Sequence, residues 1–106
     1  MLWHKLTNRK KIGDSKEQEA KRFLQQQGLT FVEQNYHCRF GEIDLIFSDP
    51  NQHALVFVEV RYRNSAKFGG AAASVTPAKQ AKIRKAALSY MTQRQLDTAM
   101  RFDVIA

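Results

Sequence analysis

Two carboxylates, on Asp44 and Glu59, have a spacing in this sequence that suits metal chemistry. Each lies in a segment typical of a β-strand: residues 42–48 alternate between apolar and polar side chains, and residues 55–63 are apolar at the even positions. Residues 49–52, with the sequence DPNQ, favour a turn between the two segments. The pattern therefore predicts an antiparallel hairpin with one of these carboxylates on each strand.

The length of the turn gives the register of this hairpin. If Ser48 pairs with Leu55, Asp44 lies directly opposite Glu59, with Cβ atoms about 4.5–5.5 Å apart. Two carboxylates this close repel each other unless a cation lies between them. A divalent cation that prefers oxygen ligands, such as Mg²⁺, fits such a pair. Arg61, two residues beyond Glu59 on the same face, can reach an anion held by that metal.

A salt bridge is the alternative explanation for the same side chains. Asp44 and Glu59 could simply neutralise Arg61 and Arg63 on a solvated face of the sheet. Strands flanked by valines are usually central and covered, however, and charged groups in such strands are seldom without a function. We therefore favour the metal site over the salt bridge.

A helix is expected to precede the hairpin. Asp14 or Ser15 can cap its first turn, and Gly28 is a good residue just beyond its end. Its buried, mainly apolar stripe is expected to carry Ala20, Phe23, Leu24 and Gln27. Glu17 lies one turn before Ala20, at the edge of this stripe. A third carboxylate is thus expected near the buried face of the first helix.

A second helix is expected from Thr76, a good N-cap, through Pro77 at the first helical position to about Gln95. Its apolar side is expected to consist of Ile83, Ala87, Tyr90 and Met91. Lys79 is either a group that reaches a substrate phosphate or a boundary lysine whose stem packs on apolar surface. Three more basic residues, which we expect to form a solvated face that also helps to hold nucleic acid, are Lys82, Arg84 and Lys85.

Strands at residues 29–38 and 101–106 complete an α-β-β-β-α-β order, with a mixed central sheet flanked by helices. Because the second helix makes a crossover, the strands before and after it should be parallel and adjacent or nearly so. Residues 13–106 thus form one expected domain of α/β class. Residues 1–12 carry several basic side chains without periodicity, Lys10 and Lys11 among them, and are expected to form an arm.

Charge and composition indicate which kind of partner and which cellular compartment to expect. The 106-residue chain has 17 Lys and Arg against 10 Asp and Glu, a net charge of +7, which favours a polyanion such as nucleic acid. No apolar run approaches the roughly 20 residues that a membrane span needs, so no membrane partner is expected. The single cysteine, Cys38, excludes an internal disulfide and favours the cytoplasm.

Four segments resemble the bacterial YraN family: residues 41–46 (GEIDLI), 57–63 (FVEVRYR), 69–76 (GGAAASVT) and 101–104 (RFDV). Proteins of this family are predicted members of the PD-(D/E)xK nuclease superfamily, with similarity to archaeal Holliday junction resolvases. The resemblance extends over about residues 13–106 and implies a restriction-endonuclease-like core. Chains of the family run on beyond the strand at which this sequence stops, so either a C-terminal extension is missing or this is a short form.

The resemblance also implies roles for single residues. Asp44 matches the acidic residue of the second strand, Glu59 and Arg61 match the (D/E)xK motif, and Glu17 matches the acidic residue of the first helix. The three carboxylates would then bind Mg²⁺ or Mn²⁺. Position 61 departs from the superfamily pattern, which has lysine. Arginine stays protonated in proteins, so Arg61 can hold a phosphate but cannot act as a base.

Three functions are open at this point. The leading hypothesis is a metal-dependent endonuclease that cleaves nucleic-acid phosphodiesters, with DNA favoured over RNA, branched DNA as one candidate substrate, and a homodimer suggested by the resolvase-like relatives. The first alternative is a nucleic-acid-binding protein without catalysis on the same fold. The second is an assembly protein whose basic surface binds a protein partner.

Overall fold

The computed structural model describes residues 2–4, 14–61 and 75–105. Lys10, Lys11 and Arg63, three of the predicted nucleic-acid-binding residues, lie outside the described residues. In chain order the elements are β1 (Leu2–His4), α1 (Asp14–Gln26), β2 (Thr30–Cys38), β3 (Gly41–Asp49), β4 (Ala54–Val60), α3 (Pro77–Gln93) and β5 (Ala99–Ile105).

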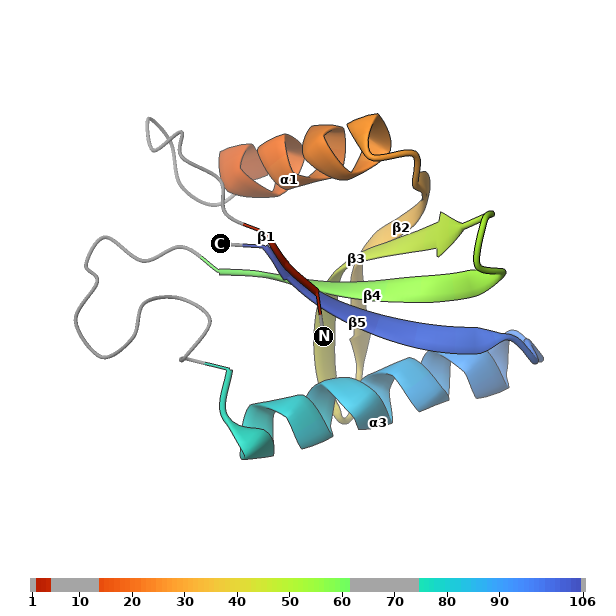
Figure 1. Cartoon of the computed structure of the whole chain (residues 1–106). Coiled ribbons are helices and arrows are strands. Elements are labelled where there is room, and N and C mark those ends of the chain that lie inside the picture. Colours follow the sequence, from red (N-terminus) through yellow and green to blue (C-terminus); the bar gives the residue numbers. More distant parts are fainter. Residues whose placement is uncertain (1, 5–13, 62–74, 106) are drawn as a thin grey trace.

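The strands form one mixed sheet in the order β1-β5-β4-β3-β2. The sheet lies between the two helices, with α1 over one face and α3 over the other (Figure 1). β2, β3 and β4 pair antiparallel, whereas β4 and β5 pair parallel. The α-β-β-β-α-β order and the α/β class expected from the sequence are confirmed, as is the parallel pairing of the strands on either side of α3.

The register of the β3–β4 hairpin is the one that the sequence predicts. Ser48 pairs with Leu55, and the ladder adds one pair, Asp49 with Ala54, before the turn. The Asp49 side chain accepts hydrogen bonds from the backbone N–H groups of Asn51 and Gln52, at 3.0 and 3.3 Å. This Asx-type arrangement stabilises the turn and thereby fixes which residues of the two strands face each other.

Each face of the sheet is covered by its own apolar cluster. The buried members on the α1 side are Ala20, Leu24, Leu29, Leu45, Phe47, Val56, Val58 and Ile105. The buried members of the larger cluster on the α3 side are Tyr36, Ile43, Ile46, Leu55, Phe57, Ala86, Ala87, Tyr90 and Met91, and a smaller cluster on this side consists of Val75, Ile83 and Val104. In β4 the even positions therefore face α1 and the odd positions face α3. Glu59, at an odd position, belongs to the α3 face.

Two details differ from the sequence-based expectation. The predicted basic arm includes a short strand, β1, which pairs parallel with β5 and covers an edge of that strand that would otherwise expose unpaired backbone groups. In addition, α1 ends at Gln26, and Gln27 is exposed rather than part of the apolar stripe. Gly28, with φ of 93°, ends the helix in the left-handed conformation that glycine adopts easily.

Helices of the described part of the chain are too short or too polar to cross a membrane.

Candidate metal and phosphate site

Asp44 and Glu59 lie where β3 and β4 separate. The last ladder pair in this direction is Leu45 with Val58, one residue before the two carboxylates. Beyond this pair, the Asp44 side chain replaces a backbone carbonyl of β3 as the acceptor for β4: its Oδ2 accepts a hydrogen bond of 2.7 Å from the N–H of Val60. On its other edge β4 continues to pair, since the N–H of Arg61 donates to the carbonyl of Ile105 at 2.8 Å. The separation of β3 from β4 thus leaves one carboxylate from each strand just beyond the end of the ladder, Asp44 half-buried and Glu59 buried.

Glu59 is 7% exposed and is flanked by two cations. Its Oε2 lies 3.1 Å from Nε of Arg61 and 3.7 Å from Nζ of Lys79. The Arg61 N–H does not align with this oxygen, so among the described residues the buried Nε has no hydrogen-bond partner. The contact is therefore a charge interaction without hydrogen-bond geometry. Arg61 and Lys79 keep 28% and 33% of their side chains exposed, so both can turn toward solvent.

Burial raises the pKa of both carboxyl groups above their ordinary values. For Asp44 burial is the largest cause, and the Val60 N–H and the nearby positive charges only partly offset it. For Glu59 burial again comes first, followed by repulsion from the Asp44 carboxylate, while Lys79 and Arg61 lower the pKa. A pair of carboxylates that burial and mutual repulsion hold against ionisation is the environment in which a bound cation is favoured.

The start of α3 brings Lys79 to this pair. Thr76 is the N-cap: its side chain accepts a hydrogen bond of 3.1 Å from the N–H of Lys79, and Pro77 follows at the first helical position. The N-terminal ends of α1 and α3 lie at the same end of the molecule as the C-terminal ends of β4 and β5 (Figure 1). The dipole of α3 therefore presents its positive end near Lys79, which favours an anion such as phosphate.

Glu17 lies in the first turn of α1, at this end of the molecule but on the helix that covers the opposite face of the sheet. Within the described ranges, no three His, Cys, Asp or Glu side chains are arranged to hold one metal ion. The structure thus brings Asp44, Glu59, Arg61 and Lys79 together. Metal binding that also involves Glu17 stays a prediction.

The other predicted nucleic-acid-binding residues that the structure describes extend from this site along α3. Lys82, Arg84 and Lys85 are all exposed, whereas Ile83 between them is buried against the sheet. The predicted helix start, apolar side and solvated basic side of α3 are thus confirmed.

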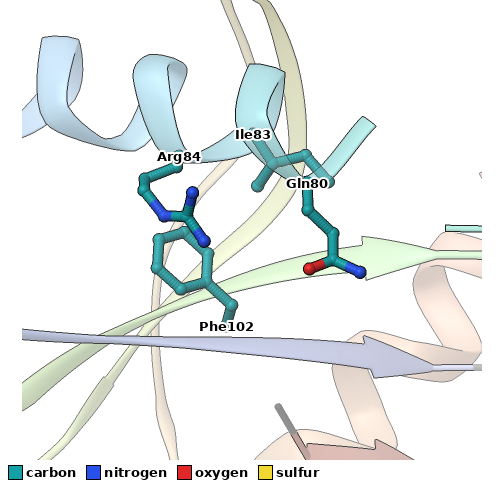
Figure 2. A pocket seen from close by; sticks show the side chains of 4 residues that line it. All are labelled: Gln80, Ile83, Arg84 and Phe102. Atoms are coloured by element: carbon teal, nitrogen blue, oxygen red, sulfur yellow. The ribbon is translucent and has the colours of Figure 1, made fainter. Parts of the chain in front are cut away.

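A hollow beside α3 is too small to be the ligand site. It is lined by Gln80, Ile83, Arg84 and Phe102, and Figure 2 shows the Arg84 side chain beside the Phe102 ring. Its volume of about 20 Å³ has room for about one water molecule. A nucleotide or a cofactor does not fit in this hollow.

One charged network was missed by the sequence-based reasoning. The Asp103 side chain is fully buried and pairs at 3.2 Å with Arg101, which also contacts Asp49 at 2.9 Å and the side chain of Gln52 at 2.8 Å. Asp49 and Gln52 lie at the β3–β4 turn, whereas Asp103 pairs with Val58, the residue before Glu59 in β4. The signal in the sequence was the opposite charge of residues two apart in one strand, which share a face.

Comparisons with known proteins assign the chain to a family. Residues 16–106 match the family described as Uncharacterised protein family UPF0102. A UPF0102 protein of Nitrosomonas eutropha is 53% identical over 94% of this chain and 84% of the relative. UPF0102 proteins of Shewanella pealeana and Shewanella halifaxensis are 47% and 48% identical over 89% of this chain and 82% and 81% of the relatives. The chain therefore belongs to the UPF0102 family, the YraN family that its motifs resemble.

Proposed function

We propose that this protein is a metal-dependent nuclease that hydrolyses phosphodiester bonds of nucleic acid, with DNA as the favoured substrate. One observation carries the proposal. The half-buried carboxylate of Asp44 and the buried carboxylate of Glu59 lie beside two cations at the point where β3 and β4 separate. Two cations beside a carboxylate pair suit a phosphate that binds at the same place. The homodimer suggested by the resemblance stays a prediction.

The donor set fits Mg²⁺ or Mn²⁺. Magnesium is usually bound by one or two carboxylates, with water and substrate phosphate as the remaining ligands, so Asp44 and Glu59 are sufficient when nucleic acid is present. Glu17 would contribute directly or through water. When bound, the cation supplies Lewis acidity that polarises the phosphate ester.

The protein's own cations would hold the substrate. In the free protein Arg61 and Lys79 neutralise Glu59. A divalent cation at the carboxylates would replace them, and both partly exposed side chains could then turn to the phosphate oxygens. Arg61 offers a planar group that can donate two parallel hydrogen bonds to phosphate. It stays protonated, so its role is positioning and charge stabilisation, and not proton abstraction.

A cleavage assay tests this proposal. Duplex, single-stranded and branched DNA, and RNA of the same sequence, are incubated with the protein in Mg²⁺, in Mn²⁺ or in excess chelator. We expect cleavage with metal, none with chelator, and none by the Asp44→Asn variant, which loses a charged ligand. Asp97→Asn, the same substitution at an exposed residue after α3, is the matched control and should cleave like the wild type.

A second candidate function is nucleic-acid binding without catalysis. The ion pairs of Glu59 with Arg61 and Lys79 favour it, because these two cations already neutralise the Glu59 carboxylate without a metal ion. Equilibrium binding measured beside cleavage separates the two. A wild type that binds nucleic acid but never cuts with either metal, and that Arg61→Lys does not activate, would leave only the binding function.

A further inference from the structure

Asn35 lies directly across the β2–β3 hairpin from Asp44. The ladder pairs on either side of this point are Gln34 with Leu45 and Tyr36 with Ile43. Asn35 has φ of 55°, in the left-handed region, although it stands in the middle of strand β2. Its side chain is exposed, so what distinguishes this residue is its backbone conformation and not its packing.

The hairpin rotates about its long axis at this residue. Residues two apart in a regular strand share a face. Leu45 nevertheless packs in the cluster on the α1 side, while Ile43 packs with Tyr36 and Tyr90 in the cluster on the α3 side. The change of face occurs between these two residues of β3, at Asp44 and opposite Asn35.

The same point is where β3 leaves β4. Pairing ends at Leu45 with Val58, and the carboxylate of Asp44, in place of a strand backbone, accepts the Val60 N–H. A regular β2–β3 hairpin would keep Ile43 on the α1 side. Without the rotation at Asn35, the end of β3 would therefore not place Ile43 on the α3 side.

We propose that the left-handed conformation of Asn35 positions Asp44: it rotates the end of the β2–β3 hairpin, separates β3 from β4 and directs the Asp44 carboxylate to the Val60 N–H and the metal site. Asn35 is thus a positioning residue, and only the chemical role of Asp44 rests on the proposed function. Asparagine suits the position, because it adopts the left-handed region far more readily than β-branched residues, which are outliers there.

The test uses substitutions at Asn35 with two readouts, the hydrogen exchange of the Val60 amide measured by NMR and the cleavage assay. Asn35→Val disfavours the left-handed backbone, whereas Asn35→Gly permits it without a side chain. Gln95→Val is the matched control, since Gln95 has φ of 54° and lies in the loop after α3, away from the site. If Asn35→Val does not fold, Asn35→Ala replaces it as a milder change. Exchange rates are compared after correction for global stability.

We expect the Val60 amide to exchange about tenfold faster or more in Asn35→Val, as for loss of a hydrogen bond to a charged acceptor, and cleavage to fall with it. Asn35→Gly and Gln95→Val should each keep the wild-type protection of the Val60 amide and the wild-type cleavage. Three results would overturn the inference. The Val60 amide could be as protected in Asn35→Val as in the wild type, it could lose its protection in Asn35→Gly, or it could be unprotected in the wild type itself. Absence of cleavage in the wild type with the expected pattern at Val60 would instead overturn the proposed function alone.

Discussion

At the residue scale, the carboxylate of Asp44 is ionised at a cost to stability. Its pKa is raised, chiefly by burial, so the folded state releases this proton at a higher pH than the unfolded state does. The favourable contribution of the protonated group is therefore present at low pH and is lost as pH rises from about 4 through the raised pKa. At neutral pH the folded protein carries a charge that its surroundings disfavour.

Asp44→Asn should for this reason increase the free energy of unfolding at pH 7. The asparagine side chain keeps an oxygen that can accept the Val60 N–H but has no charge to desolvate. Chemical denaturation from pH 3.5 to pH 7 is the measurement, and the gain over the wild type should shrink as pH falls. Asp97→Asn is the control for the loss of one negative charge at an exposed position. A variant that is less stable than the wild type at pH 7 would show that the ionised carboxylate stabilises the fold.

A substitution at Arg61 tests whether cleavage needs only a positive charge at this position. If the site needs only a positive charge near Glu59, Arg61→Lys should keep metal-dependent cleavage within about tenfold, roughly 1.4 kcal/mol of barrier. If it needs a group that can release a proton, lysine should raise the rate, because its pKa shifts readily on burial while that of arginine does not. Single-turnover cleavage rates measure this. A loss of several hundredfold would mean that the planar, two-donor geometry of Arg61 is required.

At the element scale, the N-terminus of α3 positions Lys79, and its cap can be removed without touching the charged groups. Thr76→Ala removes the hydroxyl that accepts the Lys79 N–H and should lower the free energy of unfolding by about 1 kcal/mol. Cleavage should fall as well, because the first turn then holds Lys79 less firmly beside Glu59. Denaturation and cleavage are compared with Thr92→Ala, an exposed threonine near the other end of the helix. Equal stability of the two variants would contradict the capping role.

Much of the fold and part of the site could be predicted from local patterns. Turn residues and alternation placed Ser48 opposite Leu55, and the Thr76-Pro77 pair located the start of α3. These features depend on neighbours in sequence, where spacing translates directly into geometry. The proximity of Asp44 and Glu59 followed from this register, but the two residues are not a ladder pair as predicted, because pairing ends at Leu45 with Val58.

Features that depend on distant parts of the chain were not predictable in the same way. β1 is three residues long and has too few positions to show a period, so only the open edge of β5 explains it. The left-handed backbone of Asn35 was not predicted, because asparagine tolerates this conformation but a single asparagine within a strand does not by itself indicate it. The contact of Lys79 with Glu59 required the crossover to set α3 over the end of β4.

At the scale of the whole molecule, the positive charge continues from the site onto the outer surface of α3. The net charge of the chain is +7, and Lys82, Arg84 and Lys85 are exposed on the helix whose first turn holds Lys79. A nucleic acid whose phosphate lies at Arg61 and Lys79 could extend over this surface. Affinity in this arrangement would come from phosphate contacts along the helix, and the chemistry from the carboxylates at its end.

Such binding should weaken as salt increases, with log affinity falling by about 0.9 per unit of log salt for each phosphate neutralised on duplex DNA. Replacement of Lys82, Arg84 and Lys85 together by glutamine should reduce the slope by up to about 2.7 if each contacts one phosphate. The charge-matched control replaces three basic residues outside α3, namely Lys21, Arg22 and Arg39, by glutamine. Fluorescence anisotropy from 50 to 200 mM salt, about a fourfold range, measures all three proteins. If both triple variants lose the same slope, net charge and not the α3 surface governs binding; if the wild-type affinity does not change with salt, no phosphate-contacting surface exists.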